Sequence, residues 1–196
     1  PRIKIMLALF IQDIEKILSS PRLLLANGIS VVAAGCMIVA CIVSRRRTVF
    51  LMQGVQCALL CVTQLVLGMY GGLVTLAIGA TRNFLTAFDK MNTRRTIAFA
   101  VLIGVAGTTV NFLSDGGVIG LLPVAATVIY TFGCHYLVQP NLQRLNILVN
   151  MLLWIGYSVS VLDYVTALTD ATTAVVDAAA FVIAYFCQKP KSVVKK

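Results

Sequence analysis

The chain has 196 residues, of which 59% are hydrophobic and only 12% are charged, and its formal net charge is +9. A soluble domain of this size could not cover so much apolar surface with so few charged side chains, so the composition excludes an ordinary soluble enzyme or binding domain. The apolar residues also form runs near the roughly 20 residues that a helix needs to cross the hydrocarbon core of a bilayer. We therefore expect the lipid bilayer to surround most of the chain.

Residues 1–20 precede the first long apolar run. Their apolar side chains recur at helical spacing, with charged residues between them. This pattern predicts an amphipathic helix that lies in the membrane interface and ends near Ser19, Ser20 and Pro21. The apolar positions that carry the pattern are Ile3, Leu7, Phe10, Ile14 and Leu18.

Seven apolar runs follow this segment. The chain shows no alternation of the kind that predicts strands, and within lipid only helices and closed barrels satisfy every backbone group. The sequence therefore predicts an all-α integral membrane protein with seven transmembrane helices. The expected spans are 23–43, 49–68, 71–88, 96–113, 117–138, 143–161 and 171–188.

Basic residues collect in alternate connections between these spans. The connections after the first, third, fifth and seventh spans hold eleven of them, whereas the other three connections hold only Asp115, Asp163 and Asp170. By the positive-inside rule we expect the N-terminus outside and the C-terminus in the cytoplasm. Because this placement accounts for the net charge, we expect no nucleic-acid partner. The eleven are Arg45, Arg46, Arg47, Lys90, Arg94, Arg95, Arg144, Lys189, Lys191, Lys195 and Lys196.

A weak internal repeat divides the seven spans into three, one and three. At an offset of 94 residues Tyr70 meets Tyr164, and Asn83 meets Asp177. We expect two parallel three-helix repeats, joined by a linker helix that inverts the chain. The expected units are an interfacial helix (1–20), a first repeat (21–92), the linker helix (93–115), a second repeat (116–188) and a basic cytoplasmic tail (189–196).

Polar side chains inside the expected spans mark a candidate site, because a polar group in hydrocarbon should face the bundle interior or a wet cavity. The second and sixth spans carry polar stripes, and the third and seventh carry polar and charged residues at corresponding places. We expect these faces to line a central cavity that binds a polar small-molecule substrate. The predicted substrate-binding residues are Gln56, Arg82, Asn83, Asn150, Trp154 and Asp177.

Arg82 and Asp177 carry opposite charges in corresponding helices, so we expect them to be coupled across the central cavity. Two other interpretations stay open here. Glutamine and asparagine stripes also serve as interhelical hydrogen-bonding groups. Arg82 lies close enough to the cytoplasmic end of its span to extend to the lipid headgroups instead.

The remaining marked residues have mainly structural interpretations. The six cysteines fall inside or beside the spans, where we expect them to pack as small apolar residues. His135 is the only histidine. We expect it to have a structural role, and the alternative is that it couples transport to proton movement. We expect Pro123 to kink the fifth span, and Gly104 and Gly107 to let the two halves pack closely. No metal cluster, nucleotide loop or catalytic triad can be assembled, so we expect no cofactor, no metal and no enzymatic activity.

The order and spacing of several motifs over about residues 22–188 resemble the YgjV-type bacterial inner-membrane proteins. The resemblance implies a bacterial inner membrane location and kinship with the SWEET and PQ-loop group of seven-helix carriers. No Pro-Gln pair occurs in the first or fifth span. The motifs are Leu67-Gly68-Met69-Tyr70, Ala80-Thr81-Arg82-Asn83 and Leu121-Leu122-Pro123-Val124, then Thr127, Cys134, Arg144 and Trp154.

Two functions from different classes fit these observations. The first is a SWEET-like carrier or facilitator that moves a polar small molecule by rocking spans 1–3 against spans 5–7. The second is a non-transporting membrane protein that binds a lipid or a larger membrane partner through the same polar grooves. A second copy of the chain is a further candidate partner.

Overall fold

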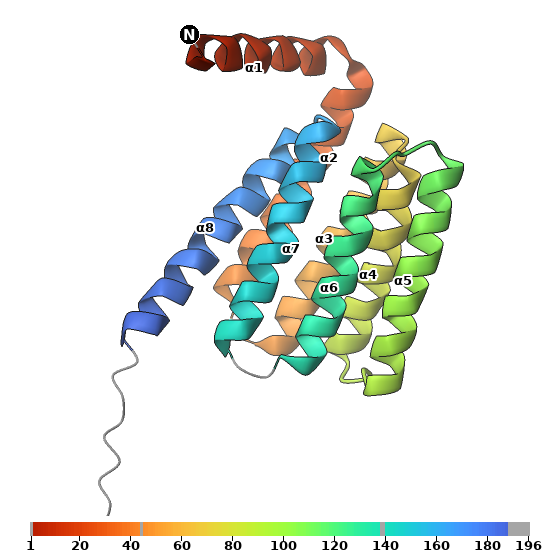
Figure 1. Ribbon diagram of the computed structural model, residues 1–196, viewed down its shortest axis with the longest axis vertical. Coiled ribbons are helices and arrows are strands. Elements are labelled where there is room, and N and C mark those ends of the chain that lie inside the picture. The colour runs from red at the N-terminus through yellow and green to blue at the C-terminus, as the bar shows by residue number, and fades with distance from the viewer. Residues whose placement is uncertain (1, 44, 138–139, 188–196) are drawn as a thin grey trace, which may run out of the picture.

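The computed structural model describes residues 2–43, 45–137 and 140–187, and it is built of helices joined by short connections (Figure 1). Among the described residues there is no strand, so the all-helical prediction is confirmed. The helices after α1 follow the predicted spans in order. The elements are α1 (Arg2–Ser19), α2 (Pro21–Ile42), α3 (Arg46–Leu67), α4 (Tyr70–Ala87), α5 (Thr93–Leu113), a 3₁₀ turn η1 (Ile119–Leu121), α6 (Leu122–Tyr136), α7 (Pro140–Ser160) and α8 (Tyr164–Cys187).

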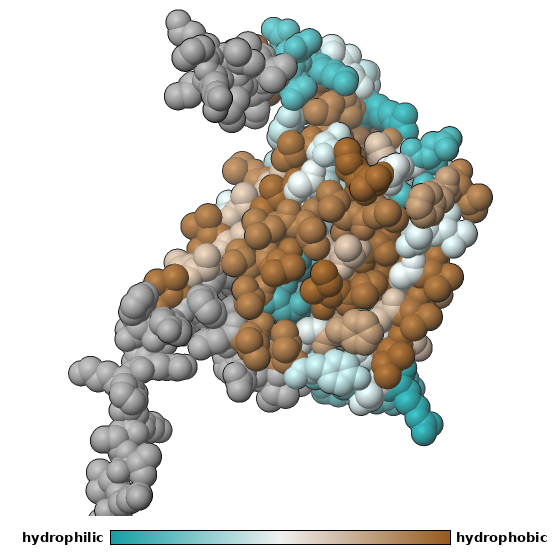
Figure 2. All heavy atoms as spheres, viewed as in Figure 1, coloured by the Kyte–Doolittle hydropathy of each residue, from teal (hydrophilic) through white to brown (hydrophobic). Residues whose placement is uncertain are grey.

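Four of the described helical segments are long and apolar enough to cross a membrane. A further apolar stretch, Leu145–Ser160, is shorter. The apolar side chains form a band over the visible face, with hydrophilic residues at both ends (Figure 2). That all seven helices cross the bilayer stays a prediction. The four segments are Pro21–Ala40, Arg47–Leu67, Thr93–Leu113 and Ile119–Tyr136.

Six helices close into a ring. Within each half of the chain the helices pack in sequence order, α2 on α3 on α4 and α6 on α7 on α8. Contacts between α4 and α6, and between α2 and α8, join the two halves, and α5 packs on α4 and α6 from outside the ring (Figure 1). We call the end with connections 68–69, 114–118 and 161–163 the upper end, and the opposite end the lower end.

The helix ends follow from local chemistry. Gly68 ends α3 with a φ of 77°, which a residue without a Cβ adopts at little cost. Ser20 and Asn92 cap α2 and α5 by accepting hydrogen bonds from the backbone N–H groups of Leu23 and Arg95. These caps and the two-residue turn after α3 hold neighbouring helices antiparallel.

The N-terminal helix has the predicted extent and runs across the upper end of the bundle (Figure 1). Its Asp13 Oδ2 accepts a hydrogen bond of 2.6 Å from the hydroxyl of Tyr164, at the start of α8. Ile11, Ile14 and Leu18 are exposed. The contact with α8 ties this helix to the bundle, and its place in the membrane interface stays a prediction.

The predicted kink at Pro123 is wrong. The 3₁₀ turn Ile119–Leu121 precedes α6, and Pro123 lies in the first turn of that helix. A proline there lacks only an N–H group that would have no partner within the helix, so it starts the helix without distorting it.

The two glycines of α5 differ in their surroundings. A Cβ added to Gly107 would lie 2.9 Å from the side-chain methyl carbons of both Thr75 in α4 and Val124 in α6, whereas nothing lies within 4 Å of one added to Gly104. Close packing at Gly107, where the two halves meet, therefore agrees with the prediction. The prediction for Gly104 is wrong, because this glycine faces open space.

These surroundings predict different effects of the same substitution at the two glycines. We expect Gly107→Leu to lower the free energy of unfolding by about 1–3 kcal/mol, because the new side chain overpacks the contact between α4, α5 and α6. Gly104→Leu, one turn away on the same helix, should be neutral or slightly stabilising. Equilibrium unfolding in mixed detergent micelles measures both. Equal losses for the two variants would contradict the packing described here.

Candidate functional site

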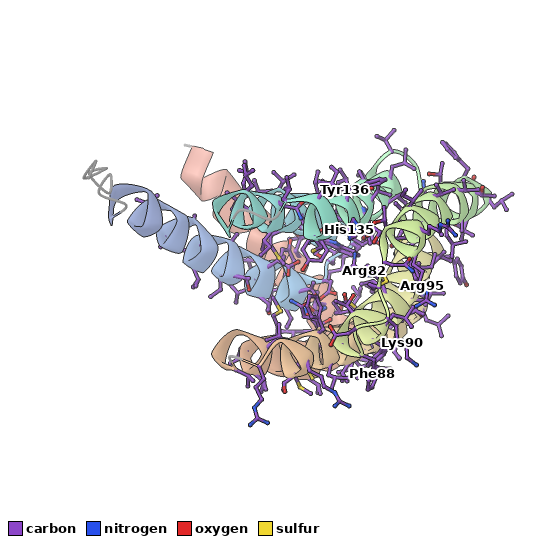
Figure 3. The ribbon with its side chains drawn as sticks, turned by 90° about the horizontal axis from the view of Figure 1, so that it is seen from below. Arg82, Phe88, Lys90, Arg95, His135 and Tyr136 are labelled. Atoms are coloured by element: carbon purple, nitrogen blue, oxygen red, sulfur yellow. The ribbon has the colours of Figure 1, made fainter. Side chains whose placement is uncertain are left out.

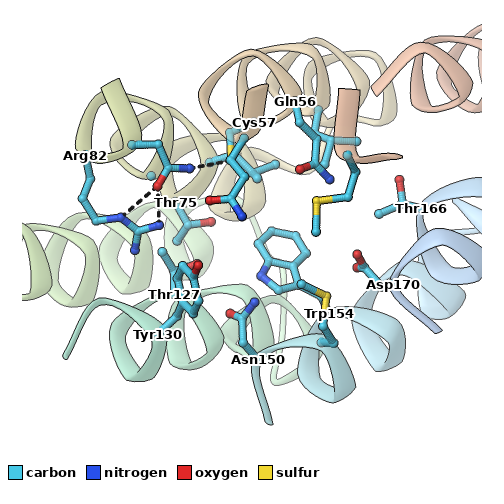
Figure 4. A pocket seen from close by; sticks show the side chains of 17 residues that line it. Gln56, Cys57, Thr75, Arg82, Thr127, Tyr130, Asn150, Trp154, Thr166 and Asp170 are labelled. Carbon is cyan, nitrogen blue, oxygen red and sulfur yellow. Dashed lines mark hydrogen bonds between the residues drawn. The ribbon is translucent and has the colours of Figure 1, made fainter. Parts of the chain in front are cut away.

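A cavity lined by both polar and apolar side chains lies at the centre of the ring. It has a volume of about 90 Å³, and every helix of the ring contributes to its lining, whereas α5 contributes no described residue (Figure 4). Five of the six predicted substrate-binding residues line this central cavity: Gln56, Arg82, Asn83, Asn150 and Trp154. Other lining residues include Met37, Gln53, Cys57, Thr75, Thr127, Tyr130, Met151, Thr166 and Asp170.

Arg82 is held inside the ring and is only 6% exposed. Its Nη1 donates a hydrogen bond of 2.6 Å to Thr131 Oγ1 in α6, and its Nε and Nη2 donate to Asn83 Oδ1. The guanidinium carbon lies 4.9 Å from the ring centre of Tyr130. Seen from below, Arg82 lies between the helices, whereas Phe88 lies at the outside (Figure 3). The side chain therefore joins the two halves of the ring instead of extending to the headgroups.

The other predicted residues surround a mixed polar and apolar space. Asn83 is 2% exposed and donates through Nδ2 to Cys57 Sγ at 3.6 Å. Asn150 and Trp154 lie on α7 and are 7% and 8% exposed. Gln53 brings a buried amide oxygen, Oε1, that has no hydrogen-bond partner. An unpaired buried acceptor is costly, so it marks a place where a ligand or water would be stabilised.

Asp177, the sixth predicted residue, belongs to α8, but its side chain lies outside the described part of the chain. Its coupling to Arg82 therefore stays a prediction. Among the carboxylates that the structure describes, none forms an ion pair with Arg82, which contacts Thr131, Asn83 and Tyr130 instead.

Asp170 is the acidic residue that sequence reasoning misplaced. The chain pattern assigned it to the connection before the seventh span, but α8 begins at Tyr164, so Asp170 lies inside the helix and lines the central cavity. It is 6% exposed. The polar residues Thr166, Thr169 and Asp170 lower the hydropathy of the first turns of α8, and the apolar run consequently begins later than the helix.

The upper side of the central cavity is closed by a contact between the two halves. The hydroxyl of Tyr157 in α7 donates a hydrogen bond of 2.5 Å to Gln64 Oε1 in α3, and both side chains are at most 2% exposed. A Cβ added to Gly72 in α4 would lie 2.6 Å from that hydroxyl. Tyr157 also packs edge-on against Trp154, with ring centres 5.7 Å apart. We call Gln64, Gly72 and Tyr157 the upper closure.

Spaces lie on both sides of this arrangement. Above the upper closure, a cavity of about 180 Å³ is bordered by Gly72, Asn111 and Tyr157. Below, a larger gap of about 470 Å³ separates α8 from its neighbours. The lower gap adjoins the central cavity, since the two share Met37, Gln53, Tyr130 and Met151. Its other lining residues include Ile38, Ile147, Leu168, Thr172 and Val176.

A second polar cluster holds the upper end of α8 against α2. Asp163 is fully buried, caps α8 through the Thr166 N–H, and accepts hydrogen bonds from Thr166 Oγ1 at 2.8 Å and Ser30 Oγ at 3.1 Å. Asn27 donates to the Leu162 carbonyl at 3.0 Å. Burial raises the pKa of Asp163, and the hydrogen bonds from Thr166 and Ser30 oppose part of that rise. This cluster lies outside the central cavity and positions one of its walls.

His135 has a structural setting. Its Nε2 lies 3.0 Å from Thr93 Oγ1 and so links the lower end of α6 to the start of α5. Four cysteines, Cys36, Cys57, Cys61 and Cys134, are free, and within the described residues no cluster of three or more His, Cys, Asp or Glu could hold a metal ion. Cys41 and Cys187 have side chains outside the described part.

The fold and the site thus define an all-helical membrane protein with a polar cavity inside its helix ring. Residues 24–187 match the model of the Imp-YgjV family, whose description is bacterial inner membrane protein. The chain belongs to this family. No curated protein and no solved structure matches it. The family match confirms the resemblance drawn from the sequence motifs and places the protein among those of the bacterial inner membrane.

Proposed function

We propose that the chain is a small carrier or facilitator, akin to the SWEET and PQ-loop proteins, that moves a polar small molecule across the inner membrane. The observation that carries this proposal is a central cavity with buried polar and ionisable groups, closed above by the hydrogen bond between Tyr157 and Gln64 and adjoining a wide gap below. A carrier needs such a site between two movable halves, exposed to one side at a time.

The contacts around the ring support rocking of α2–α4 against α6–α8. If the halves are parallel repeats, the third helix of each meets the first helix of the other, and these are the pairs α4 with α6 and α8 with α2. The upper closure and the bond between Arg82 and Thr131 both cross between the halves. Rocking of the two halves would break the upper closure while the lower gap closes.

The charge pattern indicates which side of the membrane each of these spaces faces. Five basic residues are exposed at the lower end: Arg45, Arg47, Lys90, Arg94 and Arg95. By the positive-inside rule they support the predicted topology, with the lower end in the cytoplasm and the N-terminus outside. The conformation described here is then one in which the central cavity is closed toward the outside.

Cys57 offers a test of alternating access, because it is a native thiol on the lining of the central cavity. The other five cysteines are replaced by alanine, and a membrane-impermeant thiol reagent is added to spheroplasts or to inverted vesicles. We expect labelling of Cys57 from both sides. Adding Cys57→Ala gives a variant without cysteines, which measures the background labelling. Asp115→Cys introduced into that variant should be labelled only from outside.

The second candidate, a non-transporting protein that binds a lipid or membrane partner, is favoured by one observation. The lower gap is larger than the central cavity and is bordered by apolar side chains such as Ile38, Leu168 and Val176. This alternative needs no access from outside, so labelling of Cys57 from the cytoplasmic side alone would favour it and contradict the carrier.

A further inference from the structure

Two ionisable side chains of opposite kind, one basic and one acidic, lie at the two ends of the central cavity and do not pair with each other. Arg82 from α4 and Asp170 from α8 lie at opposite sides, with Trp154 between them (Figure 4). They form no ion pair with each other or with any other charged residue that the structure describes, and each is only 6% exposed. Charging a buried carboxyl or guanidinium without a counter-ion is costly, so binding a molecule that pairs with both side chains would be favourable.

Arg82 has donors left for such a molecule. A guanidinium group has five N–H donors. Three hydrogen bonds, to Thr131 and Asn83, are formed within the protein. The remaining N–H groups belong to a side chain that lines the cavity, where they match a carboxylate.

Asp170 is the complementary end. Its carboxylate accepts no hydrogen bond from the described residues, and its oxygens are not among the fully buried unpaired atoms, so they border the cavity. A primary ammonium group supplies the positive charge and the donors that this carboxylate lacks.

The space between the two charges is largely apolar. The indole of Trp154 lies there (Figure 4), and Met37, Leu60, Leu76 and Met151 also line the cavity. Such side chains favour methylene groups. A cavity of about 90 Å³ is small, which limits the ligand to a small molecule.

We propose that the central cavity binds a small linear zwitterion, with its carboxylate on Arg82, its ammonium group on Asp170 and a short methylene chain against Trp154. This inference rests on the proposed carrier function and names the substrate class. The charges stand at opposite ends of the cavity, so an ω-amino acid fits better than an α-amino acid, whose two charged groups share one carbon.

The test measures binding of ω-amino acids of three to six carbons to the full chain in lipid nanodiscs, by calorimetry and by the emission of Trp154, which is the single tryptophan. Glycine, an α-amino acid, is a comparison ligand that we expect to bind less tightly. For the best chain length, the matching alkylamine, alkanoate and neutral diol are the comparison ligands. We expect the zwitterion to bind at least about tenfold more tightly than each of them. Wild-type protein alone gives this result, so it does not depend on a variant folding.

Two substitutions then test which residue binds each charged end of the ligand. Arg82→Gln should bind the zwitterion no better than the alkylamine, and Asp170→Asn should bind it no better than the alkanoate. Arg94→Gln and Asp115→Asn are matched controls, because both residues are exposed outside the cavity, and we expect unchanged affinity.

Equal binding of the diol or of a singly charged analogue, or no binding of any zwitterion in the series, would overturn the inference. The labelling of Cys57 needs no ligand. Failure of the zwitterions with labelling from both sides therefore rejects the substrate class alone, whereas labelling from one side rejects the carrier.

Discussion

Replacement of Asp163 by alanine is expected to lower the free energy of unfolding by about 2–5 kcal/mol. The loss of the cap of α8 accounts for about 1–2 kcal/mol. Leaving Ser30 without its acceptor in a buried site adds about 1–3 kcal/mol. Asp163 is fully buried and bonded to both α2 and α8, so no water can replace its oxygens without rearrangement. Equilibrium unfolding in mixed micelles measures the change.

Asp163→Asn separates the role of the hydrogen bonds from that of the charge. The amide keeps an oxygen for the Thr166 N–H, and its NH₂ group meets hydroxyls that also accept, so we expect a smaller loss than for alanine. Asp115→Ala, at an exposed position of the upper end, is the control. A loss below about 1 kcal/mol for Asp163→Ala would show that the cluster is not a joint between α2 and α8.

The stability of the wild type and that of Asp163→Asn should depend differently on pH. Because burial raises the pKa of Asp163 in the folded protein, its contribution to stability is fully present below the usual aspartate pKa of about 4 and is lost as the pH rises through the folded-state pKa. The asparagine variant lacks this titration. We therefore expect its melting temperature to rise relative to the wild type as the pH increases above about 4.

The helices could be predicted from the sequence because their signals are local. Apolar runs and the need to satisfy backbone groups in lipid depend on neighbouring residues only. The expected seventh span, 171–188, begins later than α8 because the first turns of this helix contain Thr166 and Asp170, which face the inside of the protein. A hydropathy pattern cannot tell a polar residue on a cavity wall from one in a connection.

The candidate site was predictable in part for the same reason. Helical spacing puts Gln56, Asn150 and Trp154 on inward faces, and the structure brings them to one cavity. The partners across that space were not predictable, because they depend on how the two halves pack. Gln64 lies on the same expected span as Gln56, yet it lies above the cavity and bonds to Tyr157, 93 residues later in the chain.

The second prediction concerns the upper closure. The losses of unfolding free energy caused by two substitutions in it should not be additive. Tyr157→Phe leaves Gln64 Oε1 unpaired in a buried site and should cost about 1–3 kcal/mol of unfolding free energy. Gln64→Leu removes the acceptor and should cost a similar amount. In the double variant neither polar group is left, so a coupling energy of about 1–2 kcal/mol is expected. Tyr136→Phe, at an exposed position, is the control.

Gly72→Ala extends this prediction from stability to access. The added Cβ would lie 2.6 Å from the Tyr157 hydroxyl and 2.9 Å from Gln64 Oε1, distances that force the two side chains apart. If their bond holds the outer side closed, the variant should label Cys57 from outside about tenfold faster, because a tenfold population shift needs only about 1.4 kcal/mol. Gly35→Ala, which meets nothing within 4 Å, is the matched control. Unchanged labelling in Gly72→Ala, together with additive losses in the double variant, would mean that Tyr157 and Gln64 are packed neighbours and that the cavity is closed elsewhere.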